Sequence, residues 1–183
     1  MTSDLRHRLI AAATSLLNAH GVEAVTIRDT ARECEVSHGA PRRYFATRKA
    51  LLGAVATNVL DDLNRAATGS GVTPRELADA YVRFAQARPH AFGLITRHDL
   101  IEDSGANLRA ITRRLTHTWA QSWASEHPDD PQLWLATFAA VHGIASLASQ
   151  RATDALGLDP DAMLDAVLTR PEARDPLPER HTP

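Results

Sequence analysis

The stretch from Thr26 to Phe45 reads TIRDTARECEVSHGAPRRYF, and its pattern predicts two short helices joined by a tight turn. Thr26 is a good N-cap for the first helix and has an acid three residues later, whereas Ser37 is a good N-cap for the second. The second helix would present small residues followed by two arginines, whose planar guanidinium groups suit phosphates and guanine edges. The stretch therefore predicts a helix-turn-helix whose second helix, over Ser37–Phe45, enters a DNA major groove.

Residues 9–55 resemble the DNA-binding domain of the TetR family of bacterial repressors. The matching positions are Leu9, Ile10, Ala12, Ala13, His20, Gly21, Val22, Val25, Thr26, Ile27, Arg28, Ala31, Arg32, Val36, Ser37, Gly39, Ala40, Phe45, Ala50, Leu51, Leu52 and Val55. The resemblance implies a three-helix DNA-binding head joined to a helical body that binds a small effector and forms a dimer. It also implies that double-stranded DNA with a palindromic operator is the partner.

Four positions depart from the usual pattern of the family. Arg42 stands where a tyrosine is common, Tyr44 where a histidine is common, and Arg48 where a lysine is common. Glu35 stands where the turn usually has glycine, so the turn is either strained by about 1 kcal/mol or different in geometry.

We assign the DNA contacts to the predicted helix-turn-helix and to the start of the helix that follows it. Ser37–Phe45 would read the groove through Arg43 and Arg42, and the remaining polar groups would bind phosphates. The candidate residues are Thr26, Arg28, Ser37, His38, Gly39, Ala40, Arg42, Arg43, Tyr44, Arg48 and Lys49.

Composition and charge are typical of a soluble globular protein of 183 residues, with 44% hydrophobic and 23% charged residues. The net charge of −2 is unevenly distributed, because residues 1–50 carry eight basic against five acidic residues. A basic head on an acidic body is typical of a protein that reads DNA. The single cysteine, Cys34, cannot form an internal disulfide, and no membrane span or export signal is evident, so we expect a cytoplasmic protein.

Hydrophobic periodicity predicts an all-α protein of about nine helices. The expected helices cover about 5–20, the two halves of the helix-turn-helix, 47–67, 74–88, a short segment from 89, 106–126, 131–152 and 160–169, with a loop or weak turn at 98–105. The expected domains are a DNA-binding domain over 1–50, a ligand-binding and dimerisation domain over 51–170, and a flexible tail over 171–183.

Two segments of the body resemble one C-terminal subclass of TetR regulators, namely the run from Tyr81 to Phe92 and the run from Trp134 to Leu147 with its His142-Gly143 pair. This resemblance raises the prospect of an effector pocket, although aromatic stripes at helical spacing are equally compatible with a plain core. The candidate pocket residues are Tyr81, Phe84, Phe92, Leu115, Trp119, Trp123, Phe138 and His142.

The segment 131–152 is apolar around most of its circumference and rich in small residues, so it is either a dimer seam or a helix buried inside one protomer. The resemblance favours a dimer seam formed with the helix at 160–169. The candidate interface residues are Ala139, Gly143, Ala145, Ala148, Met163 and Val167.

No pattern of metal-ligand, cofactor-binding or nucleophile residues stands out, so we expect no metal, no cofactor and no enzymatic activity. His142 could be a ligand-sensing group, a metal ligand or a core histidine. The favoured function is a homodimeric, ligand-responsive transcriptional regulator, a repressor released from a palindromic operator by a small apolar effector. The alternative is a helical binding protein that keeps the fold without specific DNA recognition.

Overall fold

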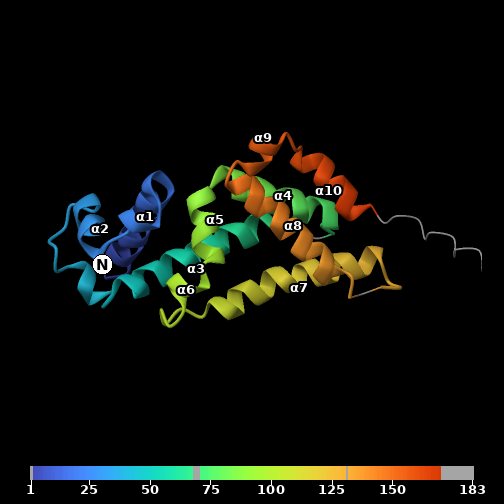
Figure 1. Ribbon diagram of the computed structural model, residues 1–183. Helices are drawn as coiled ribbons and strands as arrows, with labels where there is room; N and C mark the ends of the chain where they lie inside the picture. The colour runs from blue at the N-terminus through green and yellow to red at the C-terminus, as the bar shows by residue number, and fades with distance from the viewer. Residues whose placement is uncertain (1, 68–70, 131, 170–183) are drawn as a thin grey trace, which may run out of the picture.

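The computed structural model describes residues 2–67, 71–130 and 132–169, and these residues form helices joined by short loops (Figure 1). The α-helices are α1 (Thr2–His20), α2 (Ile27–Glu33), α3 (Arg48–Ala67), α4 (Pro74–Ala87), α5 (Pro89–Thr96), α6 (His98–Ile101), α7 (Leu108–Glu126), α8 (Trp134–Ser149), α9 (Ala152–Leu156) and α10 (Pro160–Leu168). Two short 3-10 helices cover Val22–Ala24 and Pro41–Arg43. The described residues contain no strand, which confirms the all-α prediction.

Local capping signals in the sequence set most of the helix starts. Thr73 and Glu76 form a reciprocal capping box in front of α4, whose first residue is Pro74. Thr47 accepts a hydrogen bond from the backbone N–H of Ala50 at 3.0 Å and thereby caps α3. Asp159 caps α10 in the same way.

Two helices differ from the predicted segments because of local backbone conformation. The predicted helix over 131–152 ends at Ser149, since Arg151 adopts a left-handed conformation with φ of 57° and starts the separate helix α9. The segment 98–105, predicted as a loop or weak turn, begins with the four-residue helix α6. The described chain has ten α-helices where about nine were expected, because α6 and α9 are additional and the second helix of the helix-turn-helix is replaced by the 3-10 helix Pro41–Arg43. The tail predicted over 171–183 lies outside the described residues.

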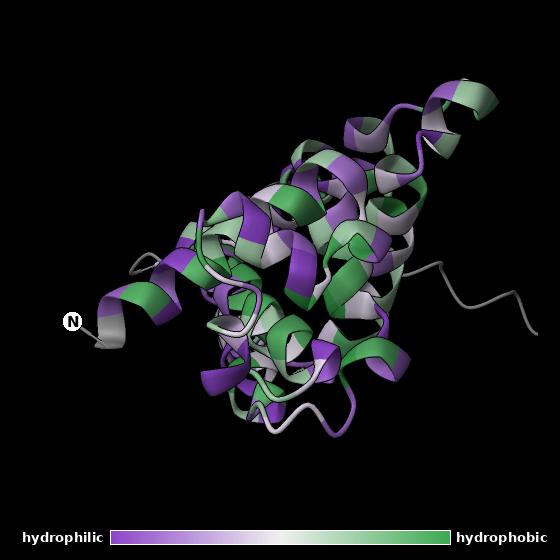
Figure 2. Ribbon diagram, turned by 90° about the vertical axis from the view of Figure 1, so that its left-hand side faces the viewer, coloured by the Kyte–Doolittle hydropathy of each residue, from purple (hydrophilic) through white to green (hydrophobic). Residues whose placement is uncertain are grey.

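Helix α3 joins the head to the body. Figure 1 shows α1 and α2 at one end of the molecule, and α3 running from them into the larger group formed by α4 to α10. Viewed onto the head in Figure 2, the helices carry both hydrophobic and hydrophilic residues, as amphipathic packing requires. A single hydrophobic core extends from Leu9 in α1, through Val55 and Leu63 in α3, to Leu164 in α10. Because the core is continuous, a displacement of α3 changes packing in both parts.

The length and apolarity of the helices also show whether any of them could span a membrane. None of the helices in the described ranges is long and apolar enough to cross a bilayer.

Candidate DNA-binding surface and ligand cavity

Thr26 sets the start of α2, where the helix-turn-helix begins. Its Oγ1 accepts a hydrogen bond from the backbone N–H of Asp29 at 3.0 Å, and its hydroxyl donates to Asp29 Oδ2 at 2.6 Å. The predicted acid is thus in place, although its carboxylate accepts a hydrogen bond from the hydroxyl of Thr26 and not from the backbone N–H, as a capping box would require. The hydrogen bond from Thr26, aided by Arg32 at 2.9 Å, lowers the pKa of Asp29 below its usual value. The hydroxyl of Thr26 is therefore used within the chain, while the first turn of α2 presents the exposed side chain of Arg28.

The turn after α2 has the left-handed geometry that glycine usually provides. The N–H of Val36 donates to the carbonyl of Ala31, and the N–H of Glu35 donates to that of Arg32, which together form a Schellman motif. Glu35 occupies its left-handed position with φ of 55°. The geometry is thus conventional, and the backbone of Glu35 carries the strain.

Replacing Glu35 with glycine is expected to raise the free energy of unfolding by about 1 kcal/mol, because glycine has no Cβ to clash in the left-handed region. Glu33→Gly is the matched control, since Glu33 is also exposed but lies in α2. That change should lower the free energy of unfolding by about 1 kcal/mol. Urea denaturation of both variants measures the difference, and an unchanged or reduced stability of Glu35→Gly would show that the turn is unstrained.

The second half of the helix-turn-helix is less regular than predicted. Residues 38–40 form a turn and Pro41–Arg43 a single 3-10 turn, so the α-helix expected over Ser37–Phe45 is wrong. Pro41 has no N–H to donate to the carbonyl of Ser37, which instead accepts from the N–H of Ala40 at 2.9 Å. Gly39 adds backbone freedom that further disfavours a regular helix.

The segment nevertheless exposes most of the candidate DNA contacts on one continuous piece of chain. The side chains of Ser37, His38, Arg42 and Arg43 are exposed, and a Cβ added at Gly39 would meet no atom within 4 Å. Ala40, Tyr44 and Lys49 are partly buried beside them. Within the described ranges, the side chains of Arg42, Arg43 and Lys49 form no hydrogen bond or ion pair, so their donors are available to another molecule.

Arg48 has a different role from the one predicted. Its Nε donates to the carbonyl of Val25 at 2.8 Å and its Nη2 to that of Val22 at 2.6 Å, with Glu23 Oε2 at 3.2 Å from the same nitrogen. The guanidinium therefore fastens the start of α3 to the chain that leads into α2. This geometry corrects the assignment of Arg48 as a direct phosphate contact, because its donors face carbonyl groups of the head.

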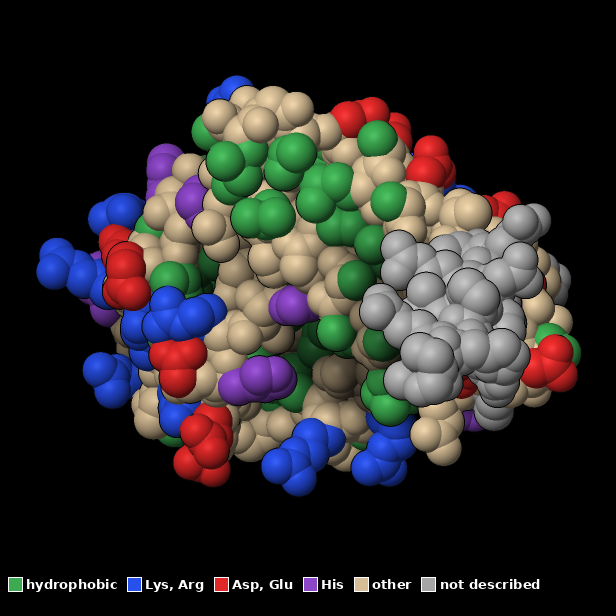
Figure 3. Space-filling model, turned by 45° about the vertical axis from the view of Figure 1, so that its right-hand side comes forward, with side chains coloured by type: hydrophobic (Ala, Val, Ile, Leu, Met, Phe, Trp, Pro, Cys, Tyr) green, Lys and Arg blue, Asp and Glu red, His purple; other side chains and the backbone are tan. Residues whose placement is uncertain are grey.

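A cavity of about 340 Å³ lies in the body, between α3, α4, α5, α6, α7 and α8. Four of the candidate pocket residues line it, namely Tyr81, Leu115, Phe138 and His142. The lining residues that the sequence did not single out are Leu60, Leu63, Ile95, Thr96, His98 and Thr112. Figure 3 shows this side of the molecule as a hollow with histidine side chains at its edge. The volume falls in the range of small-molecule sites.

The other four candidate pocket residues belong to the surrounding core. Phe92 packs edge-on against Tyr81, with ring centroids 5.6 Å apart, and Trp119 packs edge-on against Phe138 at 5.7 Å. Trp123 stacks on His127, and Phe84 lies under the guanidinium of Arg88. These four residues do not line the cavity. The sequence could not separate them from the lining residues, because aromatic residues at helical spacing can pack against neighbouring helices as well as form a cavity wall.

Tyr81 and His142 form the polar centre of the cavity wall. The Tyr81 hydroxyl lies 2.9 Å from His142 Nδ1, although the two residues are far apart in the sequence. Burial raises the pKa of the Tyr81 phenol and lowers the pKa of the His142 imidazole, so both are neutral near pH 7. His142 is therefore a half-buried wall residue with a hydrogen-bond partner. No group of histidine, cysteine or acidic residues in the described ranges could hold a metal ion.

Two family models match the sequence. One, described as the bacterial regulatory proteins of the tetR family, covers residues 9–55, and the other, the tetracyclin repressor-like C-terminal domain, covers residues 75–170. The second match extends over more than half of the chain. This chain belongs to the TetR family. It is accordingly a TetR-type transcriptional regulator and not an enzyme, and proteins of its family bind double-stranded DNA as dimers.

Individual relatives support the assignment to different extents. The HTH-type transcriptional regulator HbdR of Aromatoleum sp. (strain CIB) is 38% identical over 61 residues, which is 33% of this chain but only 27% of HbdR. A solved protein of unknown function from Rhodococcus sp. RHA1 is 30% identical, with a TM-score of 0.71 over 88% of this chain and 90% of that one. BioQ, solved with its natural double-stranded DNA operator, is 24% identical, with a TM-score of 0.57 over 88% of this chain and 96% of BioQ, and shows a shared fold.

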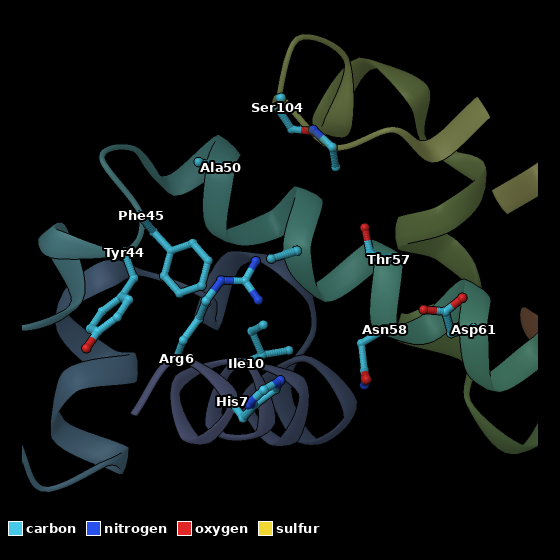
Figure 4. A pocket seen from close by; sticks show the side chains of 13 residues that line it. Arg6, His7, Ile10, Tyr44, Phe45, Ala50, Thr57, Asn58, Asp61 and Ser104 are labelled. Carbon is cyan, nitrogen blue, oxygen red and sulfur yellow. The ribbon is translucent and has the colours of Figure 1, made fainter. Parts of the chain in front are cut away.

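The TetR head and body meet closely at Gly53 in α3. A Cβ added there would lie 2.3 Å from Ser104 Oγ and 2.5 Å from Ser104 Cβ, so the loop between α6 and α7 packs directly on the backbone of α3. Beside this contact a cavity of about 410 Å³ separates the loop from α1 and from Tyr44 and Phe45 (Figure 4). The loop follows α6, whose His98 lines the body cavity, and packs on α3, which leads out of the head.

The candidate dimer residues of this TetR regulator fall into two groups. Ala139 and Gly143 are exposed on α8, and Met163 and Val167 are half-buried on α10. Ala145 and Ala148, only 0% and 5% exposed, pack inside the protomer, which corrects their assignment to the interface. Small residues occur around the whole circumference of α8, so residue size alone did not show which of them face outward.

Proposed function

We propose that this TetR-family regulator is a repressor that binds a palindromic operator as a homodimer and is released by a small apolar effector. The single observation that carries the proposal is the course of α3. Its first turn adjoins the segment that exposes Arg42 and Arg43, and its later residues Leu60 and Leu63 wall the body cavity. One rigid helix therefore joins a polar, arginine-rich surface to an apolar cavity.

The proposed DNA contacts centre on the segment from Ser37 to Tyr44. Arg42 and Arg43 have the free donors that guanine edges and phosphates accept, and Gly39 allows close approach of the backbone. Arg28, Tyr44 and Lys49 would bind phosphates on either side, together with the amides at the start of α2. We keep residues 1–50 as the proposed DNA-binding domain and 51–170 as the proposed effector-binding domain, with α3 belonging structurally to both.

The proposed dimer forms through α8 and α10. Ala139 and Gly143 are four residues apart on the exposed side of α8, and a Cβ added at Gly143 would meet no atom within 4 Å. Leu135, four residues before Ala139 on α8, is also exposed, as are Leu156 and Leu158 between α9 and α10. Figure 3 shows hydrophobic side chains gathered on one face of the molecule. A two-fold axis through this surface would place two heads on two half-sites of a palindrome.

Arg75 supports the position of α10 in this proposal. It pairs with Asp79 of α4 at 2.8 Å and with Asp165 of α10, and its guanidinium lies 3.9 Å from Asp161. The arginine therefore ties the proposed dimer helix to the wall of the effector domain.

We propose that the effector acts through the packing of the α6–α7 loop on Gly53. A ligand in the body cavity contacts α6 and α7, and any shift of the loop between them presses on α3 because no space separates Ser104 from the Gly53 backbone. An effector that favours the non-binding head spacing by about 3 kcal/mol would lower operator affinity about a hundredfold at saturation.

The test begins with in vitro selection of genomic fragments that bind the protein, followed by screening of apolar compounds for release of the selected duplex. We expect a palindromic sequence, and an effector whose affinity falls on operator addition by the same factor by which it weakens operator binding. Fluorescence anisotropy measures the first affinity and calorimetry the second. Failure to select any sequence would favour the alternative of a binding protein without DNA recognition, and unequal factors would contradict the coupling.

A further inference from the structure

We propose that the body cavity is selective for an uncharged aromatic compound that carries a hydroxyl or primary amide group, held by the Tyr81–His142 pair. This inference rests on the proposed function, since it names the chemical class of the effector for the same cavity. It is carried by the hydrogen bond between the two residues, by the absence of charge on the described cavity wall and by the aromatic rings around the pair.

The described lining residues include no lysine, arginine, aspartate or glutamate. An ionised ligand group inside the cavity would lose its hydration without gaining a countercharge, which is strongly unfavourable. His98 is exposed at the edge, and the His142 imidazole is kept neutral by burial, so neither histidine provides a buried cation near pH 7. The wall therefore favours uncharged ligands.

The Tyr81–His142 pair offers one donor and one acceptor whichever way its hydrogen bond runs. If the Tyr81 hydroxyl donates to His142 Nδ1, the neutral ring has its proton on Nε2, leaving the Nε2–H donor and the lone pairs of the tyrosine oxygen. If Nδ1–H donates to Tyr81, the phenol keeps its O–H donor and Nε2 becomes the acceptor. A ligand hydroxyl or primary amide complements either arrangement, whereas a carboxylate, having acceptors alone, complements neither fully.

The surroundings of the pair favour an aromatic ligand skeleton. The ring centroid of Phe138 lies 6.0 Å from that of Tyr81 and 6.2 Å from that of His142, and the rings of Phe138 and His142 are stacked at 25° to each other. Leu60, Leu63, Ile95 and Leu115 complete the apolar wall. The hydroxyl of Thr96 already donates to the carbonyl of Phe92 at 3.0 Å, so it is less available to a ligand than the Tyr81–His142 pair. The other polar lining residues are Thr112 and the exposed His98.

Three probes of similar shape test the inference, namely 2-naphthol, 2-methylnaphthalene and 2-naphthoate, each titrated calorimetrically into the full-length protein at pH 7. A purely apolar cavity would prefer 2-methylnaphthalene, since its methyl group costs less to remove from water than a hydroxyl. We expect 2-naphthol to bind about tenfold more tightly than 2-methylnaphthalene and more tightly still than 2-naphthoate.

Tyr81→Phe should remove the preference for 2-naphthol over 2-methylnaphthalene, while Thr118→Val, which removes a hydroxyl of α7 outside the cavity, should retain it. Equal or tighter binding of 2-methylnaphthalene would overturn the inference, as would an unchanged preference in Tyr81→Phe or the absence of binding by any probe. Tightest binding of 2-naphthoate would also overturn it and would point to the exposed arginines of α7, such as Arg113.

Operator release separates the inference from the proposed function. If 2-naphthol binds with the expected selectivity but leaves operator affinity unchanged, the cavity chemistry stands and the effector role of the cavity fails. If other apolar compounds release the operator while the cavity shows no preference for 2-naphthol over 2-methylnaphthalene, the effector role stands and the assignment of the ligand class fails.

Discussion

Ala139→Glu is expected to convert the proposed dimer to a monomer and to weaken operator binding by about a hundredfold or more. Ala139 lies exposed on α8, in the proposed interface, where a carboxylate would be buried against a second copy without a partner. Loss of the dimer removes the advantage of binding two linked half-sites, which is typically worth about a hundredfold or more. Light scattering at micromolar concentration and an operator titration measure the two effects.

Two alanines in the same protein provide matched controls. Ala110→Glu places the same carboxylate at an exposed site on α7 and should leave both the dimer and operator binding unchanged. Ala145→Glu buries the charge inside the protomer, so it should unfold the protein rather than yield a folded monomer. A folded Ala139→Glu variant that remains a dimer would contradict the assignment of this face of α8 to the interface.

The double variant Arg42→Ala/Arg43→Ala should lose at least about thirtyfold in operator affinity, because each base-reading arginine contributes about 1–3 kcal/mol. Both side chains are exposed and belong to one 3-10 turn that Pro41 holds outside the regular α-helical geometry. Little change in stability is expected, since neither side chain bonds to the described part of the chain. Anisotropy titrations against the operator and a scrambled duplex measure the loss.

Single changes separate groove reading from phosphate binding. Lys49→Ala should weaken operator and scrambled duplexes alike and reduce the magnitude of the salt slope by about one unit. Arg83→Ala, on the exposed side of α4 in the body, should alter neither affinity. If the Arg42/Arg43 variant loses affinity equally for both duplexes, these arginines bind phosphates and the groove is read by other residues.

The sequence by itself determined most of the helices and their order. Thr26, Thr47, Thr73 and Asp159 each start a helix because a side-chain oxygen satisfies backbone N–H groups within three residues of it. Such signals are local, so they can be read without knowing the packing. The same is true of the head, where the TetR resemblance rests on closely spaced residues that meet within one compact motif.

The helix predictions from the sequence were wrong in segments that contain both helix-favouring and helix-breaking residues. Ser37 is a good cap and the residues after it looked helical, but the missing N–H of Pro41 and the freedom of Gly39 limit the segment to a 3-10 turn. The left-handed backbone of Arg151 likewise divided one predicted helix into α8 and α9.

The tertiary structure decided which neighbour each side chain meets. Helical period places Ala139 and Ala145 on different sides of α8, but only the packing of α4 and α10 against α8 shows that the first faces outward and the second inward. From the sequence, Arg48 was a candidate phosphate contact. The tertiary structure shows that its guanidinium instead donates to the carbonyls of Val22 and Val25, at 2.6 and 2.8 Å. Tyr81 and His142 are 61 residues apart, and no local rule brings them together. Contacts between distant segments depend on how whole helices pack. The hydrophobic periodicity of one helix shows which face is buried but not which other helix packs against it.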